Sequence, residues 1–300
     1  MKLKYIIILF STILAFSCEK SEDINDFPLV DSKLVANCFF NPDSSFVVEL
    51  SKSLSVLDNA EIPNILGATV LLYTDGVFVD TMKNEVGSGN YKTEICPQFG
   101  KKYSLEISHP DFESISASDQ LPDSVAGIQV EMQMLDSSYT WDEYAHEYYG
   151  HAHVKTKITL PDPGYTDNYY KISAYIGDTI EDWNGSYYYE YSIYLEYESN
   201  SILEEGTGDY IVLSDEFFNG ENYVVEFEFW DGYYYPGRPY YFKINSLSRA
   251  AYLYNKTVNL YNSRKGSPFA EPVQIYNNIE NGFGIFAGYT TQVYCVKTSE

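Results

Sequence analysis

The histidines between residues 146 and 153 have the spacing that comes nearest to a metal site. Glu147 follows His146 and a second histidine comes at His151, as in the HExxH sequence of zinc proteases, but the interval is five residues instead of four. Histidines at i and i+5 do not share a helical face. On a strand, however, His151 and His153 alternate onto one face, where they could ligate a metal together with His146, Glu147 or Asp142.

The residues that follow favour a solvated face over a metal site. Lys155 and Lys157 continue the face of His151 and His153, and histidine ligands normally have carboxylates rather than lysines behind them. The acidic stretch DPGYTDN, residues 162–168, lacks the regular spacing of an EF-hand loop. We therefore expect no cofactor beyond a covalent lipid, with zinc at His146, His151 and His153, or calcium, as the less favoured alternatives.

Other patterns that could carry catalysis are weak. The glycines of GFGIFAG, residues 282–288, do not have GxGxxG spacing and no βαβ unit surrounds them, so we expect a glycine-rich turn before the last strands. There is no GxSxG motif, and His109 is isolated before Pro110. The 43 acidic residues offer too many carboxylate pairs to single one out. We expect a protein that is not an enzyme.

Aromatic side chains are the most suggestive surface feature. The three tryptophans all lie after residue 121, in the part of the chain that predicts a second domain, and each is in a stretch rich in tyrosine and acidic residues. Several of these rings fall beside turn signals such as Asn184-Gly185 and Pro236-Gly237. Rigid aromatics on loops are common in protein interfaces and sugar-stacking sites, although core packing and loop stiffening are the alternative roles. The candidate binding residues are Trp141, Trp183, Tyr233, Tyr234 and Tyr235.

Residues 1–17 have the features of a bacterial lipoprotein signal peptide. Lys2 and Lys4 precede an apolar run over residues 5–16, which is too short to span a bilayer. Ala15-Phe16-Ser17 then leads directly to Cys18, an arrangement that resembles a lipobox. Cleavage would leave Cys18 as the first mature residue, and acyl chains such as palmitate on it would anchor the protein. The alternative is an ordinary signal peptide that happens to contain a cysteine.

An acidic tether over residues 18–29 follows the cysteine. It resembles the surface-export signal of Bacteroidota lipoproteins, which places the protein on the outer membrane, facing the cell exterior. The alternative is a solvated linker that carries no address. The formal net charge of −24 makes nucleic acid and anionic lipid surfaces poor partners.

The elements that must position these residues are mostly strands, because hydrophobicity alternates with a period of two along nearly the whole chain. Asp75-Gly76 sits between two β-rich runs and supplies the positive φ values of a tight hairpin turn. About seven short strands over residues 30–121 predict an immunoglobulin-like or transthyretin-like β-sandwich. Leu121-Pro122-Asp123 breaks the pattern, and we place a domain boundary there.

Residues 122–300 predict a second β-rich domain with one helix. The helix is expected near residues 247–263, where apolar side chains recur at helical spacing after the possible caps Ser246 and Ser248. With Cys18 acylated, three thiols remain and allow at most one disulfide. They lie in or beside strand-like runs, which predicts burial for Cys38, Cys96 and Cys295.

Several stretches resemble a family of Bacteroidota lipoproteins known as domain of unknown function four-two-four-nine. They include YSLEISHPDFESISASDQLP, DNYYKISAYI, LSDEFFNGENYVV, SLSRAAYLYNK and EPVQIYNNIENGFGIFAGYT. The last is the most specific, through Asn278, Gly282, Gly284 and Gly288. The common ending of the family differs, because there an aromatic-rich tail follows a cysteine and here five residues follow Cys295. The resemblance implies an extracellular lipoprotein, often encoded beside a TonB-dependent receptor, and supplies no catalytic residues.

Three functions are compatible with the sequence. The first is a surface lipoprotein that serves as a non-enzymatic accessory or binding subunit of an outer-membrane β-barrel, such as a TonB-dependent transporter. The second is a free-standing protein that binds a glycan or another polymer. The third is an uncharacterised hydrolase. A contiguous exposed aromatic patch would favour the first, and a groove with exposed rings the second.

Overall fold

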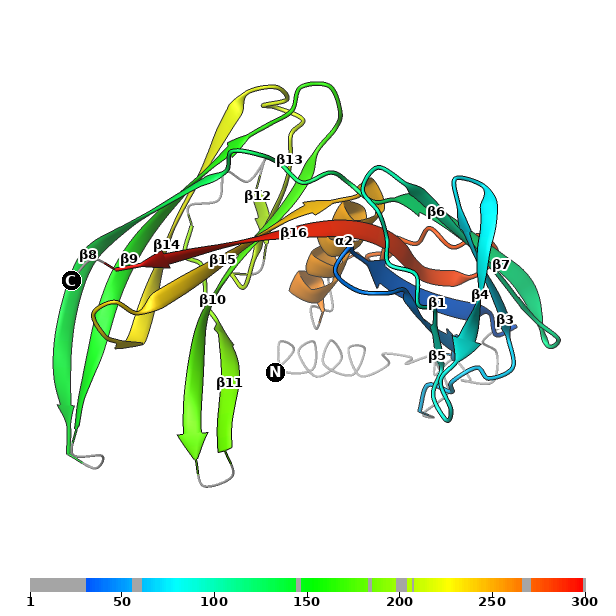
Figure 1. Cartoon of the computed structure of the whole chain (residues 1–300), viewed down its shortest axis with the longest axis horizontal. Helices are drawn as coiled ribbons and strands as arrows, with labels where there is room; N and C mark the ends of the chain where they lie inside the picture. Colours follow the sequence, from blue (N-terminus) through cyan, green and yellow to red (C-terminus); the bar gives the residue numbers. More distant parts are fainter. Residues whose placement is uncertain are drawn as a thin grey trace, which may run out of the picture.

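The computed structural model describes residues 31–55, 61–143, 147–182, 185–197, 204–206, 208–265 and 271–298. The chain is mainly β, as the alternating hydrophobicity predicts, with one described helix, α2 (Arg249–Arg264). Figure 1 shows two β-rich bodies joined by a long strand, β16 (Phe283–Lys297), drawn in red across the middle of the molecule. Residues 1–30, including Cys18, lie outside the described part of the chain.

The first body contains the strands predicted from the N-terminal half. In the sheet they follow the order β1-β2-β5-β4-β3-β6-β7 and fold round a core in a sandwich-like arrangement, which confirms the predicted class. Phe40, Phe46 and Tyr103 are among the largest fully buried side chains of this core. The strands are β1 (Leu34–Phe40), β2 (Val47–Lys52), β3 (Thr69–Thr74), β4 (Val77–Asn84), β5 (Asn90–Lys92), β6 (Lys102–His109) and β7 (Phe112–Gln120).

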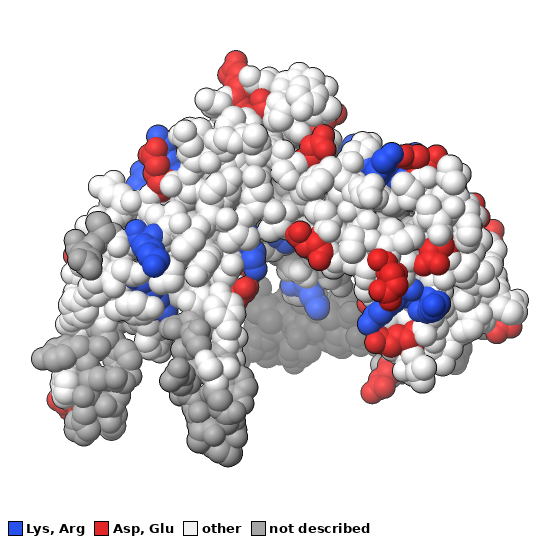
Figure 2. All heavy atoms as spheres, viewed as in Figure 1, with Lys and Arg blue, Asp and Glu red and all other residues white. Residues whose placement is uncertain are grey.

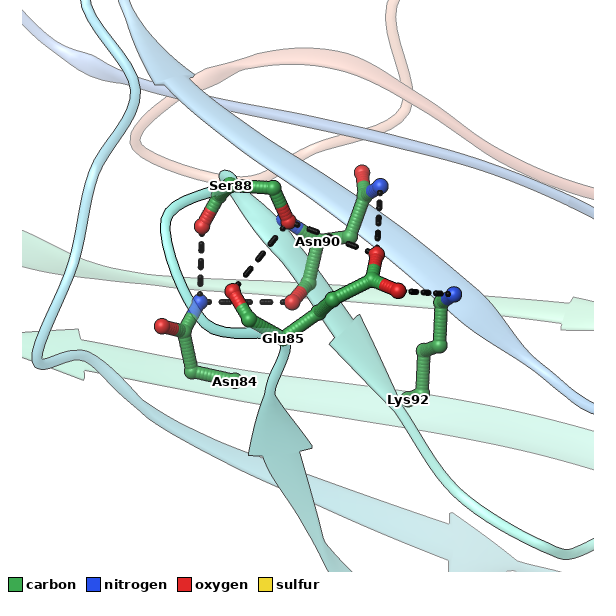
Figure 3. A network of polar contacts seen from close by, with 5 residues as sticks. All are labelled: Asn84, Glu85, Ser88, Asn90 and Lys92. Carbon is green, nitrogen blue, oxygen red and sulfur yellow. Dashed lines mark hydrogen bonds and ion pairs between the residues drawn. The ribbon is translucent and has the colours of Figure 1, made fainter.

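The turns of this body show how local sequence sets the hairpins. Asp75 and Gly76 have φ values of 50° and 80°, as predicted for the turn between β3 and β4. The turn between β4 and β5 is held by side chains (Figure 3): Asn84 Nδ2 donates to the Ser88 carbonyl at 3.0 Å, and Lys92 Nζ lies 2.9 Å from the Glu85 carboxylate. Lys92, together with other donors, lowers the pKa of Glu85.

The second body is built from two layers. A three-stranded sheet with the order β14-β9-β8 packs against the sheet that contains β10 and β15. Val154, Ile158 and Leu160 of β9 are fully buried between the layers, as the alternation predicts, and burial of each contributes roughly 1.5–3 kcal/mol. The strands are β8 (Gln129–Asp142), β9 (Glu147–Pro161), β10 (Tyr169–Asp182), β11 (Gly185–Ser192), β12 (Glu204–Gly206), β13 (Ile211–Ser214), β14 (Asn222–Tyr234) and β15 (Pro239–Leu247).

Strand β16 belongs to both bodies. Its first residues pair in parallel with β1, from Val35 opposite Phe283 to Phe40 opposite Gly288, and its remainder pairs antiparallel with β15. Phe286 is buried in the core of the first body, although it lies near the end of the chain. The boundary at residues 121 and 122 stays a prediction, but the first core is completed by a segment from the far side of that boundary.

Helix α2 covers the junction. The Ser248 hydroxyl oxygen accepts a hydrogen bond of 3.1 Å from the Ala251 amide, so one of the two predicted caps starts the helix. Ala250, Ala251 and Tyr252 are buried in a small core that also contains Ile285 of β16. The prediction of a helix near residues 247–263 is therefore confirmed, with bounds shifted by one or two residues.

The three described cysteines are free thiols. Cys38 is buried in the first core, and burial raises the pKa of its thiol to about 12. The predicted burial is wrong for Cys96 and Cys295, which are exposed. Cys96 falls in the connection after β5, and Cys295 alternates with Tyr294 and Val296, which take the core-facing side of β16.

No helix in the described ranges combines the length and the apolar character needed to cross a membrane. Charged groups are unevenly spread over the face drawn in Figure 2, where acidic and basic side chains gather on the first body and uncharged side chains cover most of the described surface of the second. On this face, the second body therefore presents the larger uncharged surface.

Candidate binding site

An aromatic cleft of about 760 Å³ lies between the end of β11 and the end of β14. Its size falls within the range of small-molecule sites, and strands from both layers of the second body contribute to it. We call it the aromatic cleft, after the rings that line it: Tyr191, Tyr194, Trp230, Tyr233, Tyr234 and Tyr235.

A β-bulge near the end of β14 sets the direction of its tyrosines. The register shifts between Asp231 and Tyr234, so β14 carries one more residue than β9 at this point. Tyr233 is 68% exposed, whereas Tyr234 is only 8% exposed and its ring lies 6.5 Å from that of Tyr139. A Cβ at Gly150 would lie 2.0 Å from the Tyr234 carbonyl oxygen, so the close approach of β9 and β14 requires glycine there.

A buried ion pair holds the turn that carries these rings. Arg238 Nη1 lies 3.2 Å from Asp231 Oδ1, and both side chains are almost fully buried. Arg238 also donates to the Tyr233 carbonyl, while the Tyr233 amide donates to Asp231 Oδ1 at 2.9 Å. Tyr240 donates to Asp231 Oδ2 at 2.7 Å, and burial together with this carboxylate raises the pKa of Tyr240. The network fixes the backbone between Asp231 and Arg238, so the exposed rings are presented on a rigid turn.

Trp230 stacks on His153 at one side of the cleft. The ring centroids are 4.2 Å apart with an interplanar angle of 2°, and Trp230 remains 60% exposed. His153 Nε2 lies 2.9 Å from the Glu228 carboxylate, and Lys155 Nζ lies 2.9 Å from Glu226. On the face of β9 that we predicted to be solvated, the side chains therefore form charged and aromatic pairs with side chains of β14.

The histidines are not assembled into a metal site by the described residues. Within those ranges no group of three or more His, Cys, Asp or Glu side chains is placed to hold a metal ion. His151 and His153 lie on the same face of β9, whereas His146 falls outside the described residues. Zinc binding at these three positions stays a prediction.

The other predicted aromatics are divided by the structure. Trp141 ends up near the tip of β8 and is 46% exposed, and Trp183 lies outside the described residues. Tyr233 and Tyr235 are exposed on the turn, whereas Tyr234 is buried beneath it. Thus two of the five proposed residues line the cleft with open rings, and a third supports it from below.

Sequence reasoning missed several residues of the cleft. Tyr191 and Tyr194 are 49% and 63% exposed, and they lie within the tyrosine-rich run YYYEYSIY, residues 187–194, which could have indicated them. A Cβ at Gly208 would meet the Tyr194 ring at 2.2 Å, so this ring rests on a glycine. The buried pair of Asp231 and Arg238 has no local signature, because only the fold removes both side chains from water.

The acidic loop at residues 162–168 is tied down by protein donors. Asp162 accepts a hydrogen bond of 2.9 Å from the Gly220 amide and another from Tyr170. Asp215 accepts one of 2.7 Å from the Asn168 amide, and burial raises the pKa of Asp215. Both carboxylates thus accept hydrogen bonds from protein donors, and calcium binding stays a prediction.

The turn that we expected at residues 282–288 is confined to its start, because Gly282 lies in the turn just before β16 whereas Gly284 and Gly288 lie within the strand. Gly284 has a φ of 116°, and its Cβ would lie 2.1 Å from the Ala36 carbonyl oxygen. At Gly288 a Cβ would meet Phe40 and the backbone of β7 at 2.9 Å. Asn278 exchanges two hydrogen bonds with the Phe286 backbone, of 2.7 and 2.9 Å. These residues allow close strand packing rather than phosphate binding.

The fold defines a β-rich protein, and a family model matches most of its sequence. Residues 21–294 match the family described as Domain of unknown function (DUF4249), and the chain is a member of that family. No curated protein matches the chain. Among solved structures, the crystal structure of a candidate membrane anchored protein from Corynebacterium diphtheriae aligns over 74% of this chain and 55% of that one, with 10% identity and a TM-score of 0.21.

Proposed function

We propose that this protein is a cell-surface lipoprotein and a non-enzymatic binding subunit of an outer-membrane β-barrel protein, with a TonB-dependent transporter as the expected case. One observation carries the proposal: exposed aromatic rings are gathered on a rigid turn and a neighbouring hairpin at one end of the second body. Tyrosine and tryptophan provide a large contact area at a small cost in conformational entropy.

The surroundings of the rings support a protein interface. Trp230, Tyr233 and Tyr235 are each at least 45% exposed, and the buried network beneath them keeps them in place before a partner binds. A preorganised surface loses less conformational entropy on association than a flexible one. In this proposal Cys18 carries the lipid that holds the protein at the membrane, and the acidic tether gives the folded part its reach.

The proposal is tested by recovering the full-length lipoprotein from outer membranes in mild detergent and identifying co-purifying proteins by mass spectrometry. The triple variant Trp230→Ala, Tyr233→Ala, Tyr235→Ala is expected to lose most of a stoichiometric barrel partner. The matched control, Phe78→Ala, Phe99→Ala, Phe217→Ala, removes three rings that are 53%, 52% and 63% exposed elsewhere, and should retain it. Recovery of the wild-type protein alone would overturn the proposal.

A second candidate function is the binding of a glycan, favoured by the concave shape of the aromatic cleft. The cleft is lined by exposed rings on which sugars could stack, among them Tyr194, Trp230 and Tyr233. A glycan array distinguishes the two candidates. Binding that is lost in the Trp230 triple variant, without a co-purifying barrel, would favour the glycan over the interface.

A further inference from the structure

A second, smaller cleft lies between α2 and the sheet at the junction of the two bodies. It has a volume of about 390 Å³ and is separate from the aromatic cleft. Strand β10 contributes Lys171 and Ser173, β15 contributes Asn245, and α2 contributes Tyr254 and Asn255. The remaining lining residues are Phe39, Leu247, Ala251 and Tyr289.

Lys171 is a partly buried lysine of this acidic protein. Lys92, Lys101 and Lys243 each lie 2.8–2.9 Å from a carboxylate, but no described carboxylate forms an ion pair with Lys171. Its Nζ donates to Asn255 Oδ1 at 3.1 Å and lies 3.9 Å from the centre of the Tyr210 ring. Burial lowers the pKa of Lys171, as expected where desolvation of an ammonium is not offset by a nearby negative charge.

Two asparagine side chains near this ammonium are held in place by their own hydrogen bonds. Asn255 Nδ2 is held by the Ala251 carbonyl at 2.7 Å, and Asn245 Nδ2 donates to Thr291 at 2.9 Å. An ammonium has three donors, and the contacts with Asn255 and Tyr210 direct two of them. The third can serve a ligand in the cleft.

The other residues that line this cleft indicate what else the ligand should contain. The Phe39 and Tyr254 rings meet edge to face at 5.5 Å, and Leu247 with Ala251 completes an apolar side. A single cation in a protein with a net charge of −24 favours a singly charged anion over phosphates with more charge. The volume is suited to a small molecule of about one ring.

We propose that this cleft binds a small carboxylic acid, with its carboxylate at the Lys171 ammonium and its apolar part against Phe39 and Tyr254. The site is independent of the aromatic cleft and of the partner proposed for it. Because a charge-assisted hydrogen bond carries much of the affinity, loss of the ammonium should weaken binding about tenfold or more.

The test is calorimetric titration of the full chain in mild detergent with phenylacetate and with its neutral counterpart phenylacetamide. Phenylacetate is expected to bind at least about tenfold more tightly than the amide. Lys171→Met should abolish this preference, and Lys243→Met, which removes an ion-paired lysine from the same sheet, should retain it. Ser173→Leu keeps the ammonium but fills the cleft, so it should block both compounds.

The outcomes that overturn the proposal are distinct. Equal binding of acid and amide, no binding of phenylacetate at millimolar concentration, or unchanged binding in Lys171→Met would each show that the lysine is structural. If Lys171→Met does not fold, as judged by tryptophan fluorescence, Ser173→Leu decides: unchanged phenylacetate binding would place the ligand elsewhere. Failure of barrel recovery has no bearing on this result, because the purified chain is used.

Discussion

Asp119 lies where three distant segments of the chain meet. Its Oδ2 accepts a hydrogen bond of 2.9 Å from the Gly288 amide of β16, and the hydroxyl of Ser248, at the start of α2, donates to the same carboxylate. Burial raises its pKa above the ordinary 3.8 more strongly than these hydrogen bonds lower it. A single carboxylate of β7 thus connects the first body to the shared strand and to the helix.

This carboxylate makes stability depend on pH. A group whose pKa is higher in the folded chain contributes stability below its unfolded-state pKa, and that contribution is lost as the pH rises through the folded-state pKa. Asp119→Asn keeps an oxygen for the Gly288 amide but does not titrate, so the decline in unfolding free energy from about pH 4 towards neutral should become shallower. Urea unfolding at several pH values measures the slope of the unfolding free energy against pH.

The control for Asp119→Asn is Asp111→Asn, which changes a side chain that is 82% exposed and should leave the pH dependence as in the wild-type protein. Identical slopes for Asp119→Asn and the wild-type protein would show that the half-buried Asp119 carboxylate does not cause the pH dependence of stability.

Gly284 is the glycine on which the parallel pairing of β16 with β1 depends most directly. Gly284→Ala places a side chain at a φ of 116° and a Cβ 2.1 Å from the Ala36 carbonyl oxygen, so we expect a loss of about 3 kcal/mol or more in unfolding free energy. Gly232→Ala, where no heavy atom lies within 4 Å of the added Cβ, should change it by less than about 0.5 kcal/mol. Equal urea unfolding midpoints for Gly284→Ala and Gly232→Ala would contradict this account.

The turn between β14 and β15 shows how a single element is stabilised for binding. Its exposed rings are held by Asp231 and Arg238, whose side chains are 2% and 5% exposed. Removing one member of such a buried pair leaves a charge without its partner, which is more costly than replacing both members. Substitutions of Asp231 and Arg238 should therefore change the stability of the turn while leaving its exposed rings in the sequence.

Arg238→Met is expected to lower the unfolding free energy by about 3–5 kcal/mol, because Asp231 stays buried without its cation. The double variant Asp231→Asn, Arg238→Met should recover much of that loss, since the Tyr233 amide can still donate to the asparagine oxygen while the asparagine amide donates to the Tyr240 hydroxyl oxygen. Urea unfolding gives both values. Lys243→Met, which breaks a surface pair with Glu190, is the control and should cost at most about 1 kcal/mol. An Arg238→Met loss as small as this would refute the argument.

At the scale of the whole molecule, β16 ties the two bodies into one structure. It supplies Phe286 to the core of the first body and pairs with β15 of the second body. Helix α2 packs against β16 where the strand runs from one body to the other. Unfolding of one body removes a strand partner from the other. We therefore expect the two bodies to unfold together.

The tryptophans provide a direct test, since all three lie after residue 121, beyond the strands of the first body. Phe46→Ala removes a ring from the first core and should destabilise it by about 3–5 kcal/mol. If the bodies are coupled, the transition followed by tryptophan fluorescence shifts to lower urea and coincides with that followed by circular dichroism. Phe99→Ala, at a ring that is 52% exposed, should shift neither. An unshifted tryptophan transition in Phe46→Ala would mean independent bodies.

Local features of the sequence were enough to predict most elements. Asp75-Gly76 determined a hairpin because few residues other than glycine and asparagine or aspartate accept positive φ. Ser248 and the helical spacing after it determined α2, and the alternation along β9 determined which of its faces is buried. Each of these signals depends on neighbours within a few residues, so it can be read from the chain directly.

The tertiary structure decided the features that join distant residues. The parallel pairing of β16 with β1 joins segments about 250 residues apart, and such a pairing leaves only glycines such as Gly284 as a local trace. The same holds for Lys171, which is an ordinary strand lysine until α2 and Tyr210 enclose it. The sequence determined which residues are aromatic, charged or free of a Cβ, and the fold determined which of them are brought together and removed from water.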